Sequence, residues 1–138
     1  MAGFDHIALS SCGTIGGLQF KNKQLIETED TIVSKVERDD FDCSIIVGTD
    51  VISHLPFTLS SKLAKKPLIL IDNHKNATAD IANIILPTAI TGIECEGLAV
   101  RLDQVPIHLP KIINPPNKVP SDENLLNKLI LKLNEEDS

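Results

Sequence analysis

The sequence predicts an α/β domain, a Rossmann-like three-layer sandwich with a mostly parallel sheet. Short aliphatic runs and helical segments alternate between residues 43 and 87, and this βαβ order builds a parallel sheet through right-handed crossovers. The aliphatic runs lack polar alternation, which is typical of strands covered on both faces. The chain has 138 residues, 42% of them hydrophobic. That length suits one such domain, and we expect residues 1–138 to form it.

The N-terminal segment predicts a strand, a loop and a helix. Residues 7–9 are a short apolar run that enters a Ser- and Gly-rich loop at residues 10–17. Thr28 precedes two acids, Glu29 and Asp30, which suit the first turn of a helix. Apolar residues then follow at helical spacing, namely Ile32, Val33 and Val36. Arg38-Asp-Asp ends this pattern.

Two helices separate three strands in the central part of the chain. Residues 43–48 predict the first strand, which ends at Gly48-Thr49-Asp50. A helix follows Pro56 and closes in lysines before Pro67, which forbids its continuation. The remaining elements are a buried strand at residues 68–71, a short helix at 77–83 and a strand at 84–86 that Pro87 stops.

The C-terminal part predicts an arm and a last helix. Glycines and prolines punctuate residues 88–120, which favours a loop-rich, hairpin-like arm within the domain. Ser121 is the expected N-cap of a final amphipathic helix, with Asp122 and Glu123 in its first turn. Five apolar residues share one face of this helix, a pattern typical of core packing: Leu125, Leu126, Leu129, Ile130 and Leu133.

Charge and composition disfavour several classes of function. Thirteen Lys and Arg against nineteen Asp and Glu give a net charge of −6, so we expect neither nucleic acid nor a membrane as a partner. The chain has no basic signal start and no apolar run near the ~18 residues that cross a bilayer, so we expect a soluble, cytoplasmic protein. Cys12, Cys43 and Cys95 match neither a disulfide framework nor a Cys-x-x-Cys metal site, and we predict reduced thiols and no metal ligands.

Polar residues follow the first two strands at the point where each strand ends. In parallel sheets, ligands bind beyond the carboxyl ends of the strands. We therefore predict a polar, acidic binding site at this edge, made by Thr49, Asp50, Asp72, Asn73 and His74.

A series of motifs carries a resemblance to a known family. It starts with Ile45-Ile-Val-Gly-Thr-Asp50 and Ser53-His-Leu-Pro56 and continues with Pro67-Leu-Ile-Leu-Ile-Asp72-Asn-His74. In this order, the motifs resemble the C-terminal part of the B subunit of formylmethanofuran dehydrogenase, in the molybdopterin-dependent oxidoreductase family. The series is completed by Thr78-Ala79, Ile81-Ala-Asn-Ile-Ile-Leu-Pro87, Gly92-Ile-Glu94-Cys-Glu96-Gly97, Arg101-Leu-Asp103-Gln-Val-Pro106 and Pro120-Ser-Asp-Glu-Asn-Leu.

The resemblance implies a domain that helps to hold one of two molybdopterin guanine dinucleotides around molybdenum or tungsten. The family's enzyme belongs to archaeal methanogenesis and reversibly reduces carbon dioxide to a formyl group carried on methanofuran. By matched position, Asp50 and Asp72 would accept hydrogen bonds from guanine or ribose, and Thr78 with nearby amides would serve phosphates. Glu94, Glu96 and Gly97 would form an acidic turn beside the cofactor, and Arg101 would bind a phosphate. The neighbours of the two acids complete the candidate set: Thr49, Asn73 and His74.

The chain departs from the family's pattern in residues and in extent. Val51 and Asn73 stand where the family has proline, Asn83 replaces an aspartate, and Leu98 and Val100 replace a threonine and an aromatic residue. The family's chain is several times longer, and the part not matched here includes the residue that binds the metal. We therefore predict no catalytic residue in this chain, which is a fragment, one product of a split gene, or a descendant that lost the chemistry.

Several residues carry a functional interpretation and a plainer one. Asp72 is either a ligand acceptor or a helix cap, and His74 either binds a ligand or only supports the loop. Residues 13–17 form either a phosphate-binding loop or a plain turn. Glu94 and Glu96 form either an acid–base pair, if that piece is extended, or a solvated turn.

Two hypotheses of function follow. In the first, the chain is a cofactor-binding portion of a molybdenum or tungsten oxidoreductase, and the metal reaches it only through a partner that supplies the unmatched part. In the second, the chain is a non-catalytic interaction or regulatory module that kept the fold and lost the cofactor. Both predict association, with the other domains or subunits of such a complex or between copies of the chain.

Overall fold

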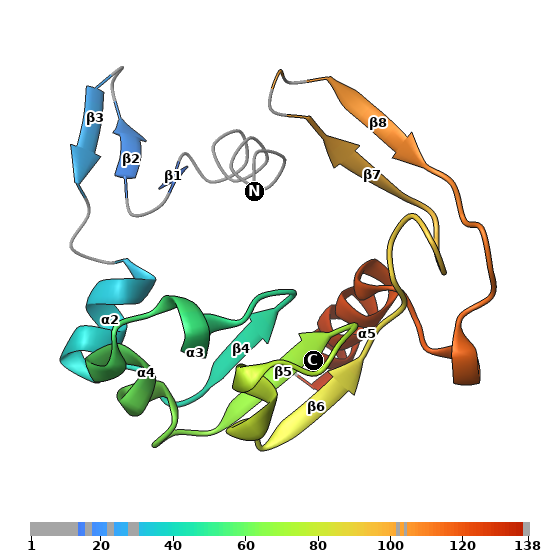
Figure 1. Ribbon diagram of the computed structural model, residues 1–138. Coiled ribbons are helices and arrows are strands. Elements are labelled where there is room, and N and C mark those ends of the chain that lie inside the picture. Colours follow the sequence, from blue (N-terminus) through green and yellow to red (C-terminus); the bar gives the residue numbers. More distant parts are fainter. Residues whose placement is uncertain are drawn as a thin grey trace.

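A parallel three-stranded sheet forms the centre of the fold. The computed structural model describes residues 14–15, 18–21, 24–27, 31–101, 103 and 105–136. The strands lie in the order β4 (Ser44–Val47), β5 (Leu68–Asp72) and β6 (Ile84–Pro87), and both pairings are parallel (Figure 1). The predicted α/β class is therefore confirmed.

Short helices pack on one face of this sheet. They are α2 (Ile32–Arg38), α3 (Val51–His54), α4 (Phe57–Leu63) and the 3₁₀ helix η1 (Ala77–Asp80). Val36 of α2 and Leu63 of α4 are buried against alternate residues of the central strand, Leu68 and Leu70. This aliphatic cluster is the core that holds the crossovers in place, because alternate strand residues face the same side.

The opposite face of the sheet, called the outer face here, is only partly covered. Alternation and register place six aliphatic residues on it: Ile45, Val47, Ile69, Ile71, Ile84 and Leu86. Ile71 is buried, but Ile45 is 55% exposed and Ile84 is 51% exposed. The prediction that the strand at residues 43–48 is covered on both faces is wrong, because β4 is an edge strand and Ile45 and Val47 on its outer face are exposed, without a covering layer from the described residues.

Local hydrogen bonds decide where two helices begin. The hydroxyl of Thr31 accepts a hydrogen bond from the Ser34 amide at 3.0 Å, so α2 begins at Ile32. The first turn of α2 therefore contains no acid, and the prediction that Glu29 and Asp30 occupy it is wrong. The segment predicted as a helix over 77–83 is the shorter 3₁₀ helix η1, capped by Asn76. Helix α3 is absent from the predicted elements, since its four residues are too few for a periodic pattern.

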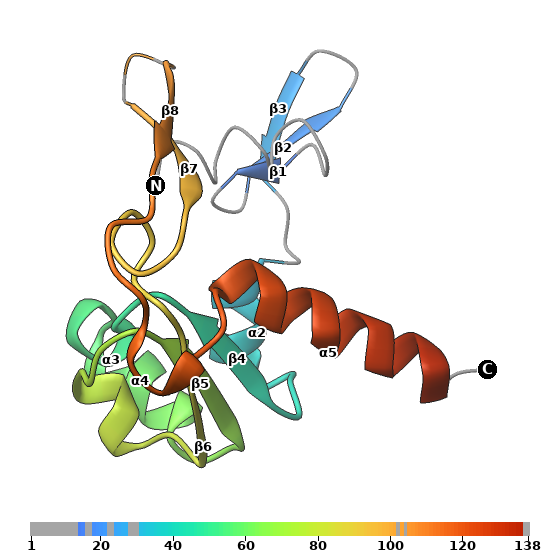
Figure 2. The same ribbon diagram turned by 90° about the vertical axis from the view of Figure 1, so that its right-hand side faces the viewer.

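Two other small sheets accompany the central one. β1 (Thr14–Ile15), β2 (Leu18–Lys21) and β3 (Gln24–Glu27) form an antiparallel meander, so the loop predicted at residues 10–17 contains a short strand. The strand predicted at residues 7–9 lies outside the described residues. In the predicted arm, β7 (Gly97–Val100) and β8 (Pro106–Leu109) form an antiparallel hairpin that projects away from the central sheet (Figures 1 and 2).

The last described element is a long helix that leaves the sheet. After the 3₁₀ helix η2 (Pro116–Lys118), α5 spans Asp122–Glu136 and extends outward (Figure 2). The Ser121 hydroxyl accepts from the Asn124 amide at 3.3 Å, as its expected capping role requires. The predicted packing of the apolar stripe is found only in part, because Leu125, Leu126 and Leu129 are half-buried, whereas Ile130 is 55% exposed and Leu133 is 62% exposed.

Candidate functional site

Asp50 joins the end of β4 to the start of η1. Its Oδ1 atom accepts hydrogen bonds from the Thr78 amide at 3.0 Å and the Thr78 hydroxyl at 2.7 Å, and its Oδ2 atom accepts from the Ser53 hydroxyl at 2.5 Å. Hydrogen bonds from Ser53 and Thr78 favour the charged carboxylate and hold the pKa of Asp50 well below its usual range. The buried Thr78 hydroxyl also accepts from the Ile52 amide at 3.2 Å. Asp50 and Thr78 are therefore brought together, as one network that ties two crossovers.

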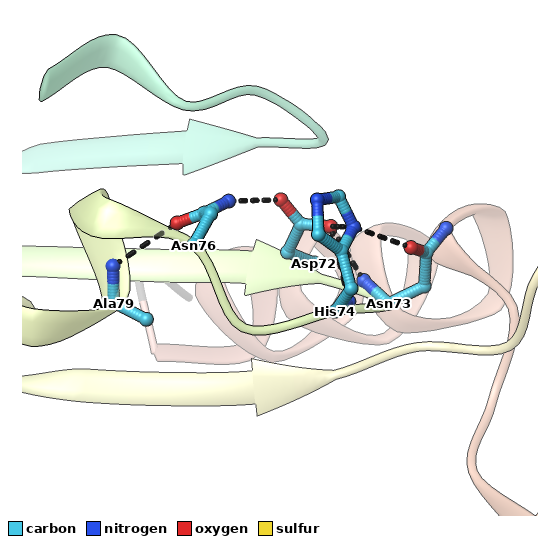
Figure 3. A network of polar contacts seen from close by, with 5 residues as sticks. All are labelled: Asp72, Asn73, His74, Asn76 and Ala79. Carbon is cyan, nitrogen blue, oxygen red and sulfur yellow. Dashed lines mark hydrogen bonds and ion pairs between the residues drawn. The ribbon is translucent and has the colours of Figure 1, made fainter. Parts of the chain in front are cut away.

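Asp72 organises the loop after β5 (Figure 3). Its side chain is only 2% exposed. Oδ1 accepts from the amides of Asn73 at 2.7 Å and His74 at 3.3 Å, and Oδ2 accepts from the Asn76 side-chain amide at 2.8 Å. The carboxylate thus satisfies three donors of the loop that leads into η1, and in this structure it acts as a cap of that loop.

The imidazole of His74 lies over the same network. Its Nδ1 atom is 2.8 Å from Asn73 Oδ1 and 3.1 Å from Asp72 Oδ1. Because both neighbours are oxygen acceptors, Nδ1 carries the proton, and the Nε2 atom is left for a further partner. The side chain of His74 is 68% exposed. His74 and the exposed Asn73 are therefore the accessible polar groups of this loop.

These residues form a polar edge at the carboxyl ends of β4 and β5, defined by Thr49, Asp50, Asp72, Asn73, His74 and Thr78. Its accessible groups, the His74 imidazole and the Asn73 amide, offer hydrogen bonds, and its two carboxylates accept hydrogen bonds from the backbone and side chains around them. Such a set suits a base or a sugar hydroxyl better than a phosphate, which needs cations or free amides. The nearby Lys75 is itself paired with Asp80 at 3.0 Å.

The acidic turn lies elsewhere, before the hairpin. Backbone hydrogen bonds close residues 90–95 into a compact turn, and Glu94 accepts from the Ile90 amide at 3.0 Å. Glu96 is exposed and lies 3.9 Å from His108. Since Glu94 sits in a turn and β7 begins only at Gly97, the extended geometry that an acid–base pair would need is absent from this segment.

Gly97 begins β7, and Arg101 directly follows its last residue. A Cβ atom at Gly97 would lie 2.5 Å from the Thr91 Cγ2 atom, so this close approach requires glycine. Arg101 lies at the turn of the hairpin, where its amide donates to the Val105 carbonyl and its guanidinium pairs with Asp103 at 2.8 Å. Arg101 is therefore on the projecting arm and not beside Asp72.

The turn and the segment before α5 enclose a polar cavity of about 590 Å³. Glu94, Glu96 and Cys95 line it from one side, and Lys111, Ser121 and Glu123 line it from the other. Cys43 and Cys95 are free thiols. In the part of the chain that the structure describes, no three His, Cys, Asp or Glu residues gather where they could hold a metal ion. No described helix has the length and apolar character to span a membrane.

Ser53, Asn76 and Asn83 are polar partners that the sequence patterns do not single out as site residues. Asn76 is the N-cap of η1, a position that its residue type favours, and Ser53 stands three residues after Asp50, within reach of its carboxylate. Asn83 accepts a hydrogen bond from the Leu68 amide at 2.8 Å and so supports the start of β5. No local pattern indicates this last contact, because it joins residues fifteen positions apart.

Comparison with known proteins identifies relatives of one kind. The chain is 41% identical over 107 residues to the B subunit of the tungsten-containing formylmethanofuran dehydrogenase 2 of Methanocaldococcus jannaschii, covering 78% of this chain and 25% of that protein. It is 42% identical over 100 residues to the protein of the same name from Methanococcus maripaludis, covering 72% and 23%. No family model matches the chain. The resemblance to this kind of subunit is confirmed, and the chain spans about a quarter of the length of these curated relatives.

Proposed function

We propose that this chain is a cofactor-binding portion of an oxidoreductase like formylmethanofuran dehydrogenase, and that it is not catalytic alone. The observation that carries the proposal is the identity of 41% and 42% to two subunits of such enzymes. The polar edge supports it, because ligands of parallel α/β sheets bind at the carboxyl ends of the strands. In the proposed assembly, other domains or subunits complete a Rossmann-like three-layer sandwich, in the cytoplasm of a methanogenic archaeon.

The residues of the polar edge fit the nucleoside end of a molybdopterin guanine dinucleotide. His74 and Asn73 are accessible hydrogen-bonding groups, and Asp72 holds both in place. Asp50 and Thr78 support the neighbouring loop, and Thr49 lies exposed beside them. When bound in a complete enzyme, the cofactor supplies a molybdenum or tungsten centre for the two-electron reduction of carbon dioxide.

The phosphate end of the cofactor would rely on other groups. Lys75 and Arg101 each form an ion pair within this chain, with Asp80 and Asp103 respectively. In the proposal, backbone amides near Thr78 meet phosphate oxygens, and Arg101 reaches a phosphate only after exchanging Asp103 for it. The turn of Glu94, Glu96 and Gly97 would lie beside the cofactor, and the metal ligand would come from the part that this chain does not span.

The proposal is tested by purifying the tagged full chain from its native host and quantifying molybdenum, tungsten and pterin on the same eluate. We expect metal and pterin to arrive with a larger polypeptide. His74→Ala should lower the pterin content about tenfold without loss of folding, because the side chain is exposed and a ligand hydrogen bond is removed. His108→Ala is the matched control, since that imidazole is 64% exposed on the arm.

Asp72→Ala separates this function from its alternative. If the edge binds the cofactor, the substitution lowers both pterin content and stability, since three loop donors lose their acceptor. If the chain is a non-catalytic interaction module, only stability falls. Asp80→Ala is the control because it removes an exposed carboxylate that pairs only with Lys75 in the contacts described. Pterin content that is unchanged in His74→Ala and Asp72→Ala would reject the polar edge as the binding site.

The alternative function rests on the internal use of the acids. Asp50 and Asp72 are both occupied by protein donors, and Asn83 replaces the family's aspartate in a purely structural contact. A chain that purifies from its host without pterin and metal would favour an interaction or regulatory module. Oxidation of formate or formylmethanofuran that depends on this chain would reject that alternative.

A further inference from the structure

A second surface of the chain is apolar and lies along the free edge of the central sheet. The strand order places β4 at the edge of the sheet, and none of the described strands lies on its side away from β5. A groove of about 620 Å³ follows this edge, between β4 and helix α2. We call it the edge groove, and Ile32, Val33, Phe41, Ile45 and Val47 are among its lining residues.

Among the described residues, the backbone of β4 has no hydrogen-bond partner on the side of the edge groove. The amides of Ser44 and Gly48 donate toward β5, to the Pro67 and Ile71 carbonyls respectively, both at 2.9 Å. Because successive residues of a strand direct their backbone groups to opposite sides, the N–H and C=O groups of Ile45 and Val47 face the groove. Such a row of free donors and acceptors is the template for an added strand.

The side chains around this row are unusually exposed for apolar residues. Ile32 is 84% exposed, Ile45 is 55% exposed, Val33 is 47% exposed and Val47 is 39% exposed. Covering them would be favourable, since burial of apolar area drives association. The side chains on one face of an added strand would pack against α2. The side chains on its opposite face would extend the outer face of the sheet. It would therefore satisfy the backbone of β4 and cover these side chains at once.

We propose that the edge groove receives a β-strand from a partner polypeptide that matches the part of the relatives that this chain does not span. The inference deepens the proposed function and rests on it. The chain accounts for only 25% and 23% of the two relatives, so about three quarters of such a subunit lie outside it. Of the two hollows, the edge groove combines apolar surface with backbone groups that have no described partner, whereas the cavity beside Glu94 is polar and acidic, so the groove is the better seat for a strand of that remainder.

The test places a photo-crosslinking amino acid at Ile45 or Ile32 of the full chain, expressed in its native host. Crosslinked peptides are identified by mass spectrometry. We expect the crosslinks to reach a segment with strand-like sequence in a polypeptide that matches the remaining part of the relatives. The exchange of the Ile45 and Val47 amides with solvent should also slow in the purified complex, because these amides become hydrogen-bonded.

Charged substitutions give the second arm of the test. Ile45→Lys with Val47→Lys should lower recovery of the larger polypeptide about tenfold, because the charges oppose strand pairing. Leu98→Lys on the arm is the matched control, since Leu98 is 76% exposed and outside the groove. Circular dichroism of each variant establishes folding, and the crosslinking arm needs no destabilising change.

The outcomes separate the two proposals. Crosslinks between two copies of this chain would overturn the inference in favour of a dimer. If the photo-crosslinker at Ile45 or Ile32 does not reach the larger polypeptide, and the two lysine substitutions leave recovery of that polypeptide unchanged, the inference is also overturned. Pterin and metal in the same eluate would still support the proposed function. Absence of any polypeptide that matches the relatives, together with absence of pterin, would reject both the inference and the function on which it rests.

Discussion

At the scale of single residues, Asp50 makes a testable contribution to stability. Hydrogen bonds from Ser53 and Thr78 lower its pKa in the folded state from the ordinary value of 3.8. The stability that it provides is therefore fully present above pH 3.8 and is lost as the pH falls toward the folded-state value. We expect Asp50→Asn to be less stable than the unmodified chain at neutral pH, with a difference that narrows below pH 3.8.

The prediction is checked by measuring the urea midpoint of unfolding of each variant from neutral pH to below pH 3.8. Asp40→Asn is the control, because it removes a carboxylate of the same charge from an exposed position. A difference between Asp50→Asn and the unmodified chain that stays constant across the acid limb would contradict the assignment of these hydrogen bonds to the charged carboxylate.

Gly97 tests the packing between the acidic turn and the hairpin. A new Cβ atom would lie 2.5 Å from the Thr91 Cγ2 atom. We expect Gly97→Ala to lower the free energy of unfolding by about 1–3 kcal/mol, because overpacking forces side chains and backbone to shift. Combining it with Thr91→Ser, which removes the clashing methyl group, should restore most of the loss. Chemical denaturation of the two single variants and the double variant completes a double-mutant cycle. Additive losses in the free energy of unfolding would show that the contact with Thr91 does not cause the destabilisation.

At the scale of elements, the start of α2 depends on one hydroxyl. Thr31 accepts from the Ser34 amide at 3.0 Å and satisfies one of the free amides of the first turn. We expect Thr31→Ala to lower the free energy of unfolding by about 1 kcal/mol. Thr31→Ser should have a smaller effect, because serine keeps the capping hydroxyl. Urea denaturation followed by far-ultraviolet circular dichroism measures both. Equal losses in the two variants would mean that the methyl group, and not the cap, contributes.

The elements that sequence reasoning predicts well are those with strong local signals. Continuous aliphatic runs that end at Gly48, Asp72 and Pro87 predict the three strands of the sheet. The predicted start of α2 is misplaced because the pattern of residue types places Glu29 and Asp30 in the first turn, whereas the hydrogen bond from the Ser34 amide to Thr31 begins the helix at Ile32. A pattern of residue types records the preference of a position for an element, but it does not record which of two competing local contacts forms.

At the scale of the whole molecule, the same limit applies to the site and to the surfaces. The carboxyl ends of parallel strands meet at one edge, so the common location of Asp50 and Asp72 follows from topology. Their partners Ser53 and Asn76, and the exposure of Ile45, depend on which neighbours surround each position. Ile45 and Ile84 on the outer face, and Ile130 and Leu133 on the stripe of α5, are residue types suited to burial that remain exposed in the described structure.

The stability of the whole chain should therefore depend on its partner. Among the described residues, the fully packed apolar cluster is small and centres on Leu68 and Leu70, whereas Ile32, Ile45 and Leu133 remain largely exposed. A partner that binds only the folded chain stabilises it by about 2.7 kcal/mol when its free concentration is about 100 times Kd. We expect the urea midpoint of this chain to be higher in the purified complex than alone. The Ile45→Lys and Val47→Lys substitutions should abolish that increase and should change the midpoint of the isolated chain less, because both side chains are only partly buried in it, with exposed fractions of 55% and 39%. Equal midpoints with and without the partner would show that the exposed apolar surface is not covered on assembly.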